Sequence, residues 1–528
     1  MNADKTRRDF LRTTSLVAGS VITAGRVAFA KDSGAVVADT ANGKIRGVDL
    51  NGIKLFRGIP YGGSTAGKNR FMPPTKVEKW SGVRDGSERG HISPQTLVKN
   101  PGDYEKTIEW DKERGGLGED CLNLNIWTPA VKDGGKRTVM VSYHGGGFTT
   151  GSGNLGVYDG EAMARFGNVV VVTVNHRLGA LGYTDLSGLG GPEFAYSGVA
   201  GMMDCVASLE WVRDNIESFG GNPKSVMIFG QSGGGAKTST LLSMPSAKGL
   251  FHRAAVQSGS TIRLTHHEAA TKTAEQLLAA LGLDKSKLSE LQNIPFEKIV
   301  AAQKAAGPVV DGKIIPRDPF DPTAPEVSAD VPMIIGTELQ DAGLRMTDWD
   351  LTDAGLKTYV AGVAPEHADK VLATYRKAYP DARPYLIKAM LASDRAVRHN
   401  ATLQAERKAA LGHAPAYLYR WDWPSPAYGG KFGAVHGTDV SMALHNAAAH
   451  ISMATPDTPP AADAKLMADR LGSVWLAFAK TGDPNNKTIP HWPAYNAKER
   501  PTMIFDNNTR VENDPNHEIR VMWDEIGA

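Results

Sequence analysis

The sequence contains very little cysteine and no recognisable pattern of metal ligands. Only two of its 528 residues are cysteines, Cys121 and Cys205. A disulfide framework therefore cannot support the fold. The fold must be stabilised by a hydrophobic core, and a chain of this length can build a large one. Neither a His-Glu-x-x-His nor a Cys-x-x-Cys motif occurs, which argues against a structural or catalytic metal ion. We expect neither a metal nor another cofactor.

Clustered basic residues are also absent. The 59 lysines and arginines nearly balance the 57 aspartates and glutamates, which gives a formal net charge of +2. Residues 1–30 contain five basic and two acidic residues, a net charge of +3, so the rest of the chain carries about −1. This balance gives no support for a nucleic-acid partner, because such proteins carry a basic patch or stripe.

Residues 1–30 show the features of a bacterial export signal in their usual order. Arg7 and Arg8 form a twin-arginine motif, a short apolar segment covers residues 15–25, and Ala28-Phe29-Ala30 fits a cleavage site. The apolar segment is too short and too polar to span a bilayer, and no cysteine follows it that could carry a lipid. We expect residues 1–30 to be a twin-arginine signal peptide, with the mature protein periplasmic or secreted and without a stable membrane anchor.

The remaining residues, 31–528, alternate short apolar runs with segments of helical spacing. Residues 36–61 contain two Asn-Gly turn signals, which predict an antiparallel start. Buried-strand patterns then recur at 122–127, 139–143, 169–174 and 226–229, and helical spacing covers 198–219. Strands that alternate with helices predict a mostly parallel central sheet with helices on both faces, an α/β fold.

Two later segments, residues 264–306 and 353–412, are rich in alanine and favour helices. Open α/β sheets bind their ligands beyond the carboxyl ends of the strands. We expect these two segments to form a helical cap there, so that residues 31–528 make one catalytic domain.

The most informative segment surrounds Ser232. An apolar run, residues 226–229, leads into Gly230-Gln231-Ser232-Gly233-Gly234 and then into a helix-compatible stretch. A Gly-x-Ser-x-Gly sequence between a strand and a helix is the nucleophile elbow of α/β-hydrolases, in which small residues permit the sharp turn that exposes the serine hydroxyl. The alternative is a glycine-rich loop with an incidental serine, but the flanking pattern favours a nucleophile.

A second glycine-rich segment follows an earlier predicted strand. Tyr143-His144-Gly145-Gly146-Gly147 matches the oxyanion loop that accompanies the elbow in these hydrolases. The amides of Gly146, Gly147 and Gly233 would together form a three-donor oxyanion hole, and each donor is typically worth ~3 kcal/mol at the transition state. The alternative is a flexible turn without a catalytic role.

Several further segments occur in an order that resembles one protein family. The sequence is similar to type B carboxylesterases and lipases, which include the cholinesterases, from about Gly43 to Phe505, in segments that include 56–61, 119–125, 175–179, 219–223 and 478–485. The resemblance implies an α/β-hydrolase fold with a helical cap. It also implies a carboxylic-ester hydrolase that acts on a small-molecule ester through an acyl-enzyme intermediate.

The same resemblance implies the base and the acid that would assist Ser232. Residues 433–439 are similar to the family's catalytic-histidine segment, which makes His436 the base, and His144 and His176 are expected to be structural. The family usually has Gly-Thr-Asn-x-Asp-Glu-Gly around its acid, and Asp341 stands at the position of that glutamate. Glu338, three residues earlier, is the alternative acid.

The chain departs from the family pattern at two places that matter for the site. The family's elbow commonly has Glu-Ser-Ala-Gly, whereas this chain has Gln231 and Gly233 on either side of the serine. Ser93 stands where many relatives have a cysteine that pairs with the one matching Cys121. The resemblance therefore implies that this disulfide is absent and that Cys121 is a free thiol.

The same residues are compatible with two other functions. The same triad could hydrolyse an amide or a carbamate, because the catalytic groups alone do not distinguish leaving groups. Some cholinesterase-like proteins are non-catalytic binding domains, and that function would require the triad to be incomplete. Every element of a triad has a candidate in this sequence, which favours an ester hydrolase.

Overall fold

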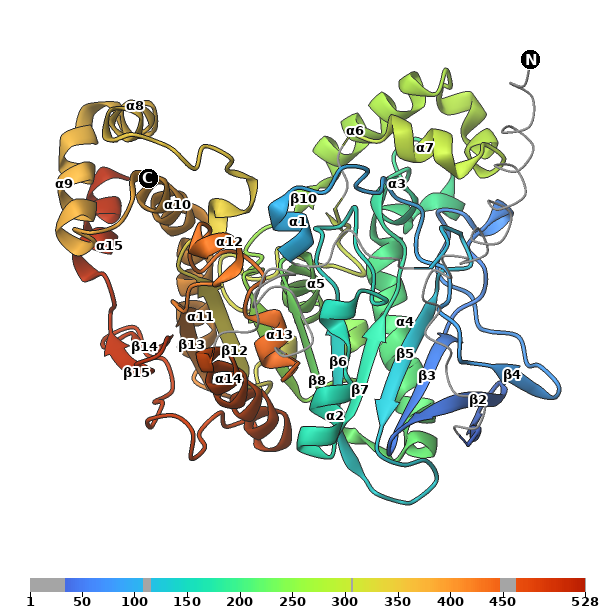
Figure 1. Cartoon of the computed structure of the whole chain (residues 1–528). Helices are drawn as coiled ribbons and strands as arrows, with labels where there is room; N and C mark the ends of the chain where they lie inside the picture. The colour runs from blue at the N-terminus through green and yellow to red at the C-terminus, as the bar shows by residue number, and fades with distance from the viewer. Residues whose placement is uncertain (1–33, 108–114, 305–306, 447–461, 528) are drawn as a thin grey trace, which may run out of the picture.

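The structure is a computed structural model that describes residues 34–107, 115–304, 307–446 and 462–527. The predicted signal peptide, residues 1–30, lies outside these ranges. A large twisted sheet runs through the molecule (Figure 1). In spatial order its strands are β1 (Val36–Thr40), β2 (Gly43–Leu50), β3 (Ile53–Pro60), β5 (Asn123–Thr128), β7 (Val170–Val174), β6 (Arg137–Tyr143), β8 (Gly221–Gln231), β9 (Arg253–Gln257), β12 (Met333–Glu338), β13 (Ala416–Trp421), β14 (Pro501–Phe505) and β15 (Arg510–Asn513), and β4 (Val83–Asp85) pairs with β2.

The central part of this sheet is parallel, and its edges are antiparallel except for the parallel pairing of β4 with β2. Every pairing from β7 through β6, β8, β9, β12 and β13 to β14 is parallel. Antiparallel pairings join β1 to β2, β2 to β3, β3 to β5 and β5 to β7 at one edge, and β14 to β15 at the other. The predicted mostly parallel sheet with an antiparallel N-terminal start is confirmed.

Helices cover both faces of the sheet, as the continuous apolar runs of its central strands require. The helices are α1 (Asp103–Thr107), α2 (Glu161–Gly167), α3 (Gly179–Tyr183), α4 (Ala200–Asn215), α5 (Gly233–Leu241), α6 (His267–Ala280), α7 (Phe296–Ala302), α8 (Asp353–Val363), α9 (Ala368–Ala378), α10 (Pro384–Ser393), α11 (His399–Ala410), α12 (Ala427–Gly430), α13 (Val440–Ala443), α14 (Ala462–Thr481) and α15 (His517–Ile526). Figure 1 shows α2, α13 and α14 in front of the sheet and α4 behind it.

Alternate residues of one strand enter two different hydrophobic cores. Val226 and Ile228 of β8 pack in the core beneath α4, whereas Met227 and Phe229 pack in the core beneath α14. This alternation follows from the two-residue repeat of a strand. The two cores hold β8 rigidly, and Ser232 follows directly after it.

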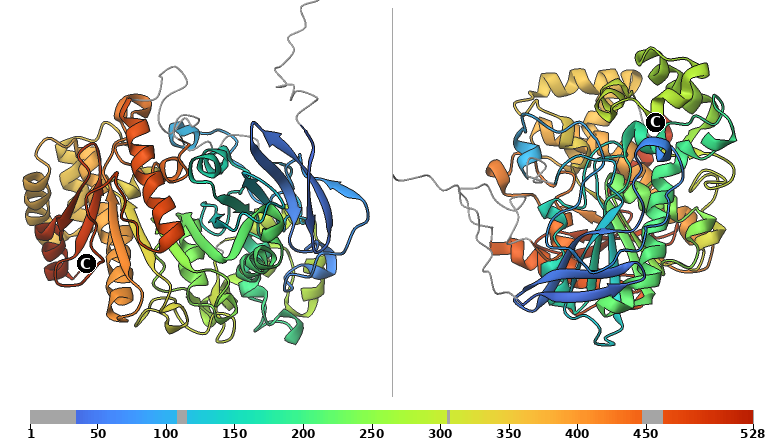
Figure 2. Two further views of the ribbon diagram at one scale, coloured as in Figure 1. Left: turned by 90° about the horizontal axis from the view of Figure 1, so that it is seen from below. Right: turned by 90° about the vertical axis from the view of Figure 1, so that its right-hand side faces the viewer.

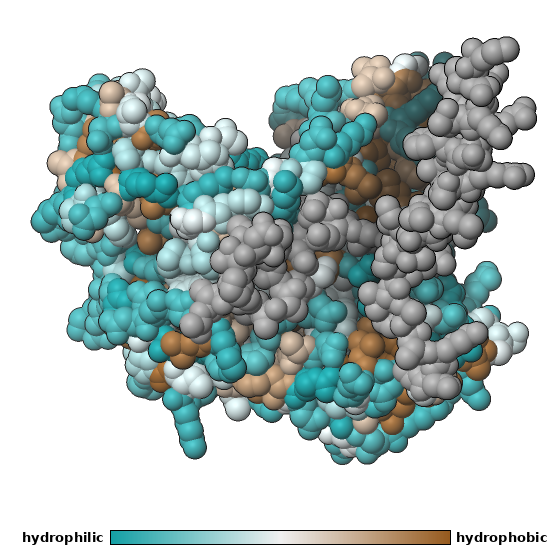
Figure 3. Space-filling view, in the orientation of Figure 1, coloured by the Kyte–Doolittle hydropathy of each residue, from teal (hydrophilic) through white to brown (hydrophobic). Residues whose placement is uncertain are grey.

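Two groups of helices flank the upper end of the sheet in Figure 1, and the views in Figure 2 show the same arrangement from below and from the side. One group, α6 and α7, shares a hydrophobic cluster with α3; the other, α8 to α10, shares one with α15. A notch in the surface separates the two groups (Figure 3).

The predicted cap segment 353–412 is divided, because its last helix, α11, packs on β12 and β13 of the sheet. A short parallel pair, β10 (Thr265–His266) and β11 (Val309–Val310), borders the first group.

Cys121 and Cys205 are both buried and both free. Burial raises the pKa of the Cys121 thiol to about 12, and a hydrogen bond with Ser93 opposes that rise. Ser93 therefore lies beside Cys121, at the place where the family resemblance predicted a missing disulfide.

Among the described residues, no helix combines the length and the apolar character needed to cross a membrane.

Candidate active site

Ser232 lies in a sharp turn between β8 and α5. Its backbone has φ of 59° and ψ of −124°, a conformation that a residue with a side chain rarely adopts. Two backbone hydrogen bonds hold it there: the Ser232 N–H donates to the Gln257 carbonyl at 2.8 Å, and the Ala236 N–H donates to the Ser232 carbonyl at 2.9 Å. The strained turn is thus fixed by the neighbouring strand β9 and by the first turn of α5.

The glycines on either side of Ser232 allow two segments to approach each other closely. A Cβ atom on Gly230 would lie 2.5 Å from the carbonyl carbon of Gly234, and one on Gly234 would overlap the carbonyl oxygen of Tyr143. Neither distance is tolerated between non-bonded atoms. The Gly-x-Ser-x-Gly spacing is therefore required by the close approach of these backbone segments.

The oxyanion loop begins where β6 ends, at Tyr143. Gly146 and Gly147 have φ values of 88° and 61°, which favour glycine. The Gly146 carbonyl accepts from the Thr150 N–H at 3.0 Å, and this turns the next N–H, that of Gly147, to the other side of the peptide. Within the described residues, the N–H groups of Gly146, Gly147 and Gly233 make no hydrogen bond to another residue. These three donors are the ones that the sequence analysis assigned to the oxyanion hole.

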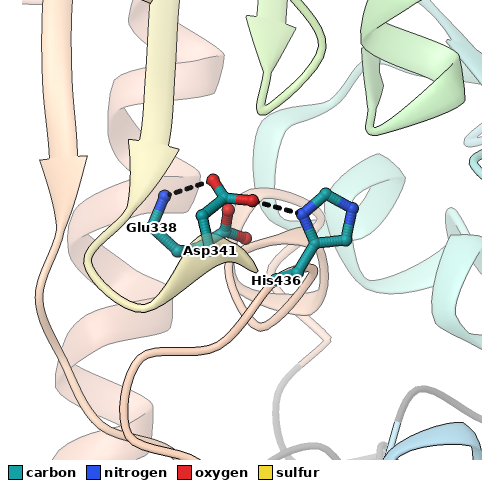
Figure 4. A group of neighbouring side chains, drawn as sticks. All are labelled: Glu338, Asp341 and His436. Carbon is teal, nitrogen blue, oxygen red and sulfur yellow. Dashed lines mark hydrogen bonds and ion pairs between the residues drawn. The ribbon is translucent and has the colours of Figure 1, made fainter. Parts of the chain in front are cut away.

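Asp341 and His436 come together from two different segments of the chain (Figure 4). Asp341 begins a short helical turn after β12, and its Oδ1 lies 2.5 Å from His436 Nδ1. The Asp341 side chain is completely buried, whereas that of His436 keeps an edge exposed. The Tyr104 hydroxyl of α1 donates to the His436 carbonyl at 2.9 Å and so also holds the loop that carries the imidazole.

Glu338, the alternative acid, contacts the backbone beside the histidine rather than its ring. Its Oε1 accepts from the Gly437 N–H at 2.6 Å, and its Oε2 is hydrogen-bonded to the Ser258 hydroxyl. Asp341 Oδ2 accepts from the Glu338 N–H at 3.0 Å and lies 2.5 Å from the Ser258 Oγ. Glu338 thus supports the histidine loop, and Asp341 is the carboxylate that meets the imidazole.

The two carboxyl groups differ in charge although both are buried. Burial alone would raise the pKa of Asp341, but the interactions with His436, Glu338 and Ser258 outweigh it and hold that pKa below its ordinary value. Burial, together with the nearby charges of Asp439 and Asp341, raises the pKa of Glu338 well above its ordinary value. When two carboxyl groups share one buried site, one of them takes up a proton. Asp341 is the ionised partner and Glu338 the neutral one.

The predicted residues open on one pocket of about 270 Å³. Ser232, His436, Gly146 and Gly147 line it, and Asp341 lies behind His436. Its other walls are mixed: the apolar side chains are those of Val98, Val157, Leu344 and Val440, and the polar ones include Glu105, Arg345, Gln231, Tyr104 and Tyr158. The serine, the imidazole and the amides of the oxyanion loop thus border the same small pocket.

Three residues that sequence reasoning missed support this pocket. Ser258 bridges the two carboxyl groups, Tyr158 accepts from the Gly145 N–H at 2.8 Å, and Asp439 accepts from the Tyr419 hydroxyl at 2.6 Å. Each lies outside the catalytic motifs or at their edge, so no local pattern marks it. His144 and His176, which were expected to be structural, stack on each other at 4.9 Å behind the oxyanion loop.

Glu338, Asp341 and His436 are also of the residue types that bind metals, and their ligand atoms lie within 4.8 Å of one another. Their polar atoms are already engaged in the hydrogen bonds just described, and Nδ1 of the imidazole faces Asp341. The cluster can orient the imidazole without a cation.

Comparison with known proteins shows similarity along nearly the whole chain. Residues 34–523 match the carboxylesterase family. A para-nitrobenzyl esterase of Bacillus subtilis is 33% identical over 505 residues, which cover 92% of this chain and 97% of the relative. Human carboxylesterase 3 is 30% identical over 504 residues, covering 88% of this chain and 86% of that protein. The crystal structure of a Geobacillus stearothermophilus carboxylesterase matches with a TM-score of 0.79 and 32% identity, covering 92% of this chain and 99% of that one.

Proposed function

Because the chain belongs to the carboxylesterase family, we propose that Ser232, His436 and Asp341 are the catalytic triad of this carboxylic-ester hydrolase. The fold is that of the α/β-hydrolases, and ester hydrolysis by a serine hydrolase is the activity that the family and the relatives establish. The observation that carries the residue assignment is the 2.5 Å contact between His436 Nδ1 and Asp341 Oδ1 at the wall of the pocket that contains Ser232.

In the first half of the reaction, Ser232 Oγ attacks the ester carbonyl carbon and His436 takes up the serine proton through Nε2. The ionised Asp341 stabilises the resulting imidazolium and keeps the Nδ1 proton directed toward itself. The tetrahedral intermediate carries its negative charge on the former carbonyl oxygen. His436 then protonates the leaving alcohol, the carbon–oxygen bond to that alcohol breaks, and an acyl-enzyme remains on Ser232.

In the second half, water replaces the alcohol. His436 takes a proton from water as the water oxygen attacks the acyl carbon, and a second tetrahedral intermediate forms. Its collapse releases the carboxylic acid and returns the proton to Ser232. In both halves the amides of Gly146, Gly147 and Gly233 would donate to the oxyanion, and the helix dipole of α5 favours the same negative charge.

The experiment that tests this assignment is covalent labelling of the nucleophile. We expect an organophosphonate to modify the wild-type enzyme at Ser232 with a stoichiometry of one, measured by intact-mass and peptide mass spectrometry. Ser232→Ala should lose both the label and at least about a thousandfold in kcat, since triad removal leaves only the residual catalysis of the oxyanion hole and substrate binding. Labelling of another residue in Ser232→Ala, with turnover preserved, would overturn the assignment.

The substrate class follows from the size of the pocket. A pocket of about 270 Å³ suits small esters with short or compact acyl groups, because it has little room for a long chain. We expect nitrophenyl esters of two to four carbons to be hydrolysed with a higher kcat/KM than esters of twelve carbons. Matching anilides and carbamates in the same assay distinguish an esterase from an amide or carbamate hydrolase, and a higher kcat/KM for either of these would favour the alternative.

We further propose that residues 1–30 direct export through the twin-arginine route to the periplasm or beyond it. The twin arginines, the short apolar segment and the Ala-x-Ala site support this proposal. Replacing Arg7 and Arg8 together by lysine should leave active enzyme in the cytoplasmic fraction, whereas the wild-type chain should be recovered from the periplasm with Lys31 as its first residue. Equal export of the two chains would contradict it.

A further inference from the structure

The catalytic helix α5 carries a lysine that the mechanism above does not use. Lys237 lies five residues after Ser232, and its side chain is completely buried. Burial lowers the pKa of its amine to about 7. Within the residues that the structure describes, no carboxylate forms an ion pair with it. Burying an amine without an acidic partner costs free energy of folding. The groups that accept hydrogen bonds from this amine therefore indicate what the lysine does in the fold.

Among the described residues, the polar contacts of the Lys237 amine are with the oxyanion loop. Its Nζ donates to the Gly147 carbonyl at 2.7 Å and to the His144 carbonyl at 3.1 Å. The same amine lies 5.3 Å from the centre of the Phe148 ring, which is within reach of a cation–π interaction. Lys237 therefore binds both ends of the segment that contains Gly146 and Gly147.

Gly233 lies one helical turn before Lys237, so the two residues occupy the same face of α5. A Cβ atom on Gly233 would lie 2.5 Å from the Gly147 nitrogen and would overlap the Gly147 carbonyl oxygen. The peptide of Gly147 is thus in direct contact with the beginning of the helix. The absence of a side chain at 233 makes room for this peptide, and the amine of Lys237 holds it there.

We propose that Lys237 is a positioning residue of the oxyanion hole, which fastens the Gly146–Gly147 segment to the helix that begins at the nucleophile. This inference rests on the proposed catalytic role of Ser232. The loop contributes two of the three oxyanion donors and the start of the helix contributes the third, so their relative position decides whether all three meet one oxygen atom. Either protonation state of Lys237 can serve, because even a neutral amine has two N–H groups for the two carbonyls.

A second buried lysine in the same molecule provides a matched control. Lys408 of α11 is also buried, and its Nζ donates to two backbone carbonyls, those of Ser328 at 3.0 Å and Ala329 at 2.6 Å. Burial lowers the pKa of Lys408 to about 8. Lys408 and its partners do not line the catalytic pocket. Removing it tests what any buried lysine of this type contributes to stability, without disturbing the oxyanion donors.

The experiment compares Lys237→Met with Lys408→Met in the mature enzyme. We expect Lys237→Met to lower kcat for a nitrophenyl ester about 10- to 100-fold while KM changes less than about threefold, because loss of one oxyanion donor typically costs 10²–10³ and a displaced loop weakens rather than removes its donors. The affinity for a trifluoromethyl ketone, which forms a tetrahedral adduct with the serine, should fall by a similar factor. Lys408→Met should keep kcat within about twofold.

Both variants are expected to lower the thermal midpoint, so activity is expressed per serine titrated by an organophosphonate. Lys237→Gln, whose amide can still donate to one of the two carbonyls, should recover part of the lost kcat and serves if Lys237→Met does not fold. A Lys237 variant that titrates fully and keeps both kcat and ketone affinity within threefold of wild type would overturn the proposal. Failure of the wild-type enzyme to label at Ser232 would instead overturn the catalytic assignment itself.

Discussion

The nucleophile side of the pocket is held together mainly by backbone contacts, whereas the acid side is held by hydrogen bonds between side chains. Around Ser232, close approach depends on Gly230, Gly233 and Gly234, and the Lys237 side chain reaches from α5 to the oxyanion loop. Around Asp341, in contrast, the carboxylate, a second carboxyl group, a serine hydroxyl and an imidazole meet within one buried cluster. The first arrangement is sensitive to added volume, and the second is sensitive to charge and to the position of protons.

This difference determines how each side should respond to substitution. A methyl group added beside the nucleophile displaces a backbone donor, so it should lower kcat without changing the pH dependence of stability. A change of charge at Asp341 or Glu338 should alter the tautomer of His436 or the number of protons that the cluster binds. Such a change leaves the volume of the side chain almost unchanged.

The largest effect is expected for Asp341→Asn, which keeps the shape of the side chain and removes its charge. Asparagine cannot stabilise the imidazolium and can hold His436 in the wrong tautomer, a change that lowers kcat about 10⁴-fold in another serine hydrolase. We expect a loss of similar size in steady-state kinetics, with phosphonate labelling slowed in parallel. If Asp341→Asn retained near-wild-type turnover while Glu338→Gln lost it, the two carboxyl groups would have to exchange roles.

The next effect is expected for Gly233→Ala on the nucleophile side. Alanine is the residue that the family commonly has here, but in this chain its Cβ atom would overlap the Gly147 peptide. We expect kcat to fall about 10- to 100-fold through displacement of the oxyanion donors. In the control Gly362→Ala, in α8, no atom lies within 4 Å of the added methyl group. That variant should keep full activity and gain about 0.4–1 kcal/mol of stability. Full activity of Gly233→Ala would show that the loop moves aside at no cost.

A smaller effect on activity, but a distinct effect on stability, is expected for Glu338→Gln. The pKa of Glu338 is higher in the folded than in the unfolded chain, so the folded state binds more protons and its stability falls as pH rises from the unfolded value near 4.5. The lowered pKa of Asp341 acts at lower pH and in the opposite direction, since that contribution is lost as pH falls. Glutamine has the shape of the neutral acid and does not titrate.

We therefore expect the thermal midpoint of Glu338→Gln to decline less than that of the wild type between about pH 5 and pH 8, with kcat within about threefold of wild type. Thermal unfolding followed by circular dichroism at several pH values measures this directly. Glu366→Gln, on the exposed surface before α9, provides a charge-matched control and should follow the wild-type curve. Parallel curves for Glu338→Gln and the wild type would mean that Glu338 is ionised in the folded protein.

The same contrast explains how much could be predicted from the sequence. The elbow and the oxyanion loop are local: a strand pattern followed by glycines at fixed spacing is enough to predict Ser232, Gly146 and Gly147. The parallel sheet is equally local in its pattern, because each central strand is a continuous apolar run. Lys237 is different, because its partner is a carbonyl 90 residues earlier in the chain.

The acid side depended on tertiary position in the same way. Glu338 ends β12 and Asp341 begins the helical turn that follows it, and only the path of the histidine loop determines which carboxylate faces the ring. Ser258 follows a different strand, β9, and has no motif that would connect it to the triad. The cap was predicted as two helical segments, but the packing of α11 on the sheet depends on buried residues such as Ala401 and Ala405 rather than on helix propensity.

The smallest effect concerns the two cysteines, which lie in a hydrophobic core and line neither side of the pocket. Burial raises the pKa of both thiols, so they should be unreactive in the native state. We expect a thiol reagent to detect no free thiol in the folded enzyme and two after denaturation without reductant. Reductant should leave the thermal midpoint unchanged, because Ser93 stands beside Cys121 where a disulfide would otherwise form. A midpoint that falls on reduction would show that the core depends on a covalent link, and the rigidity ascribed here to packing alone would then need a different explanation.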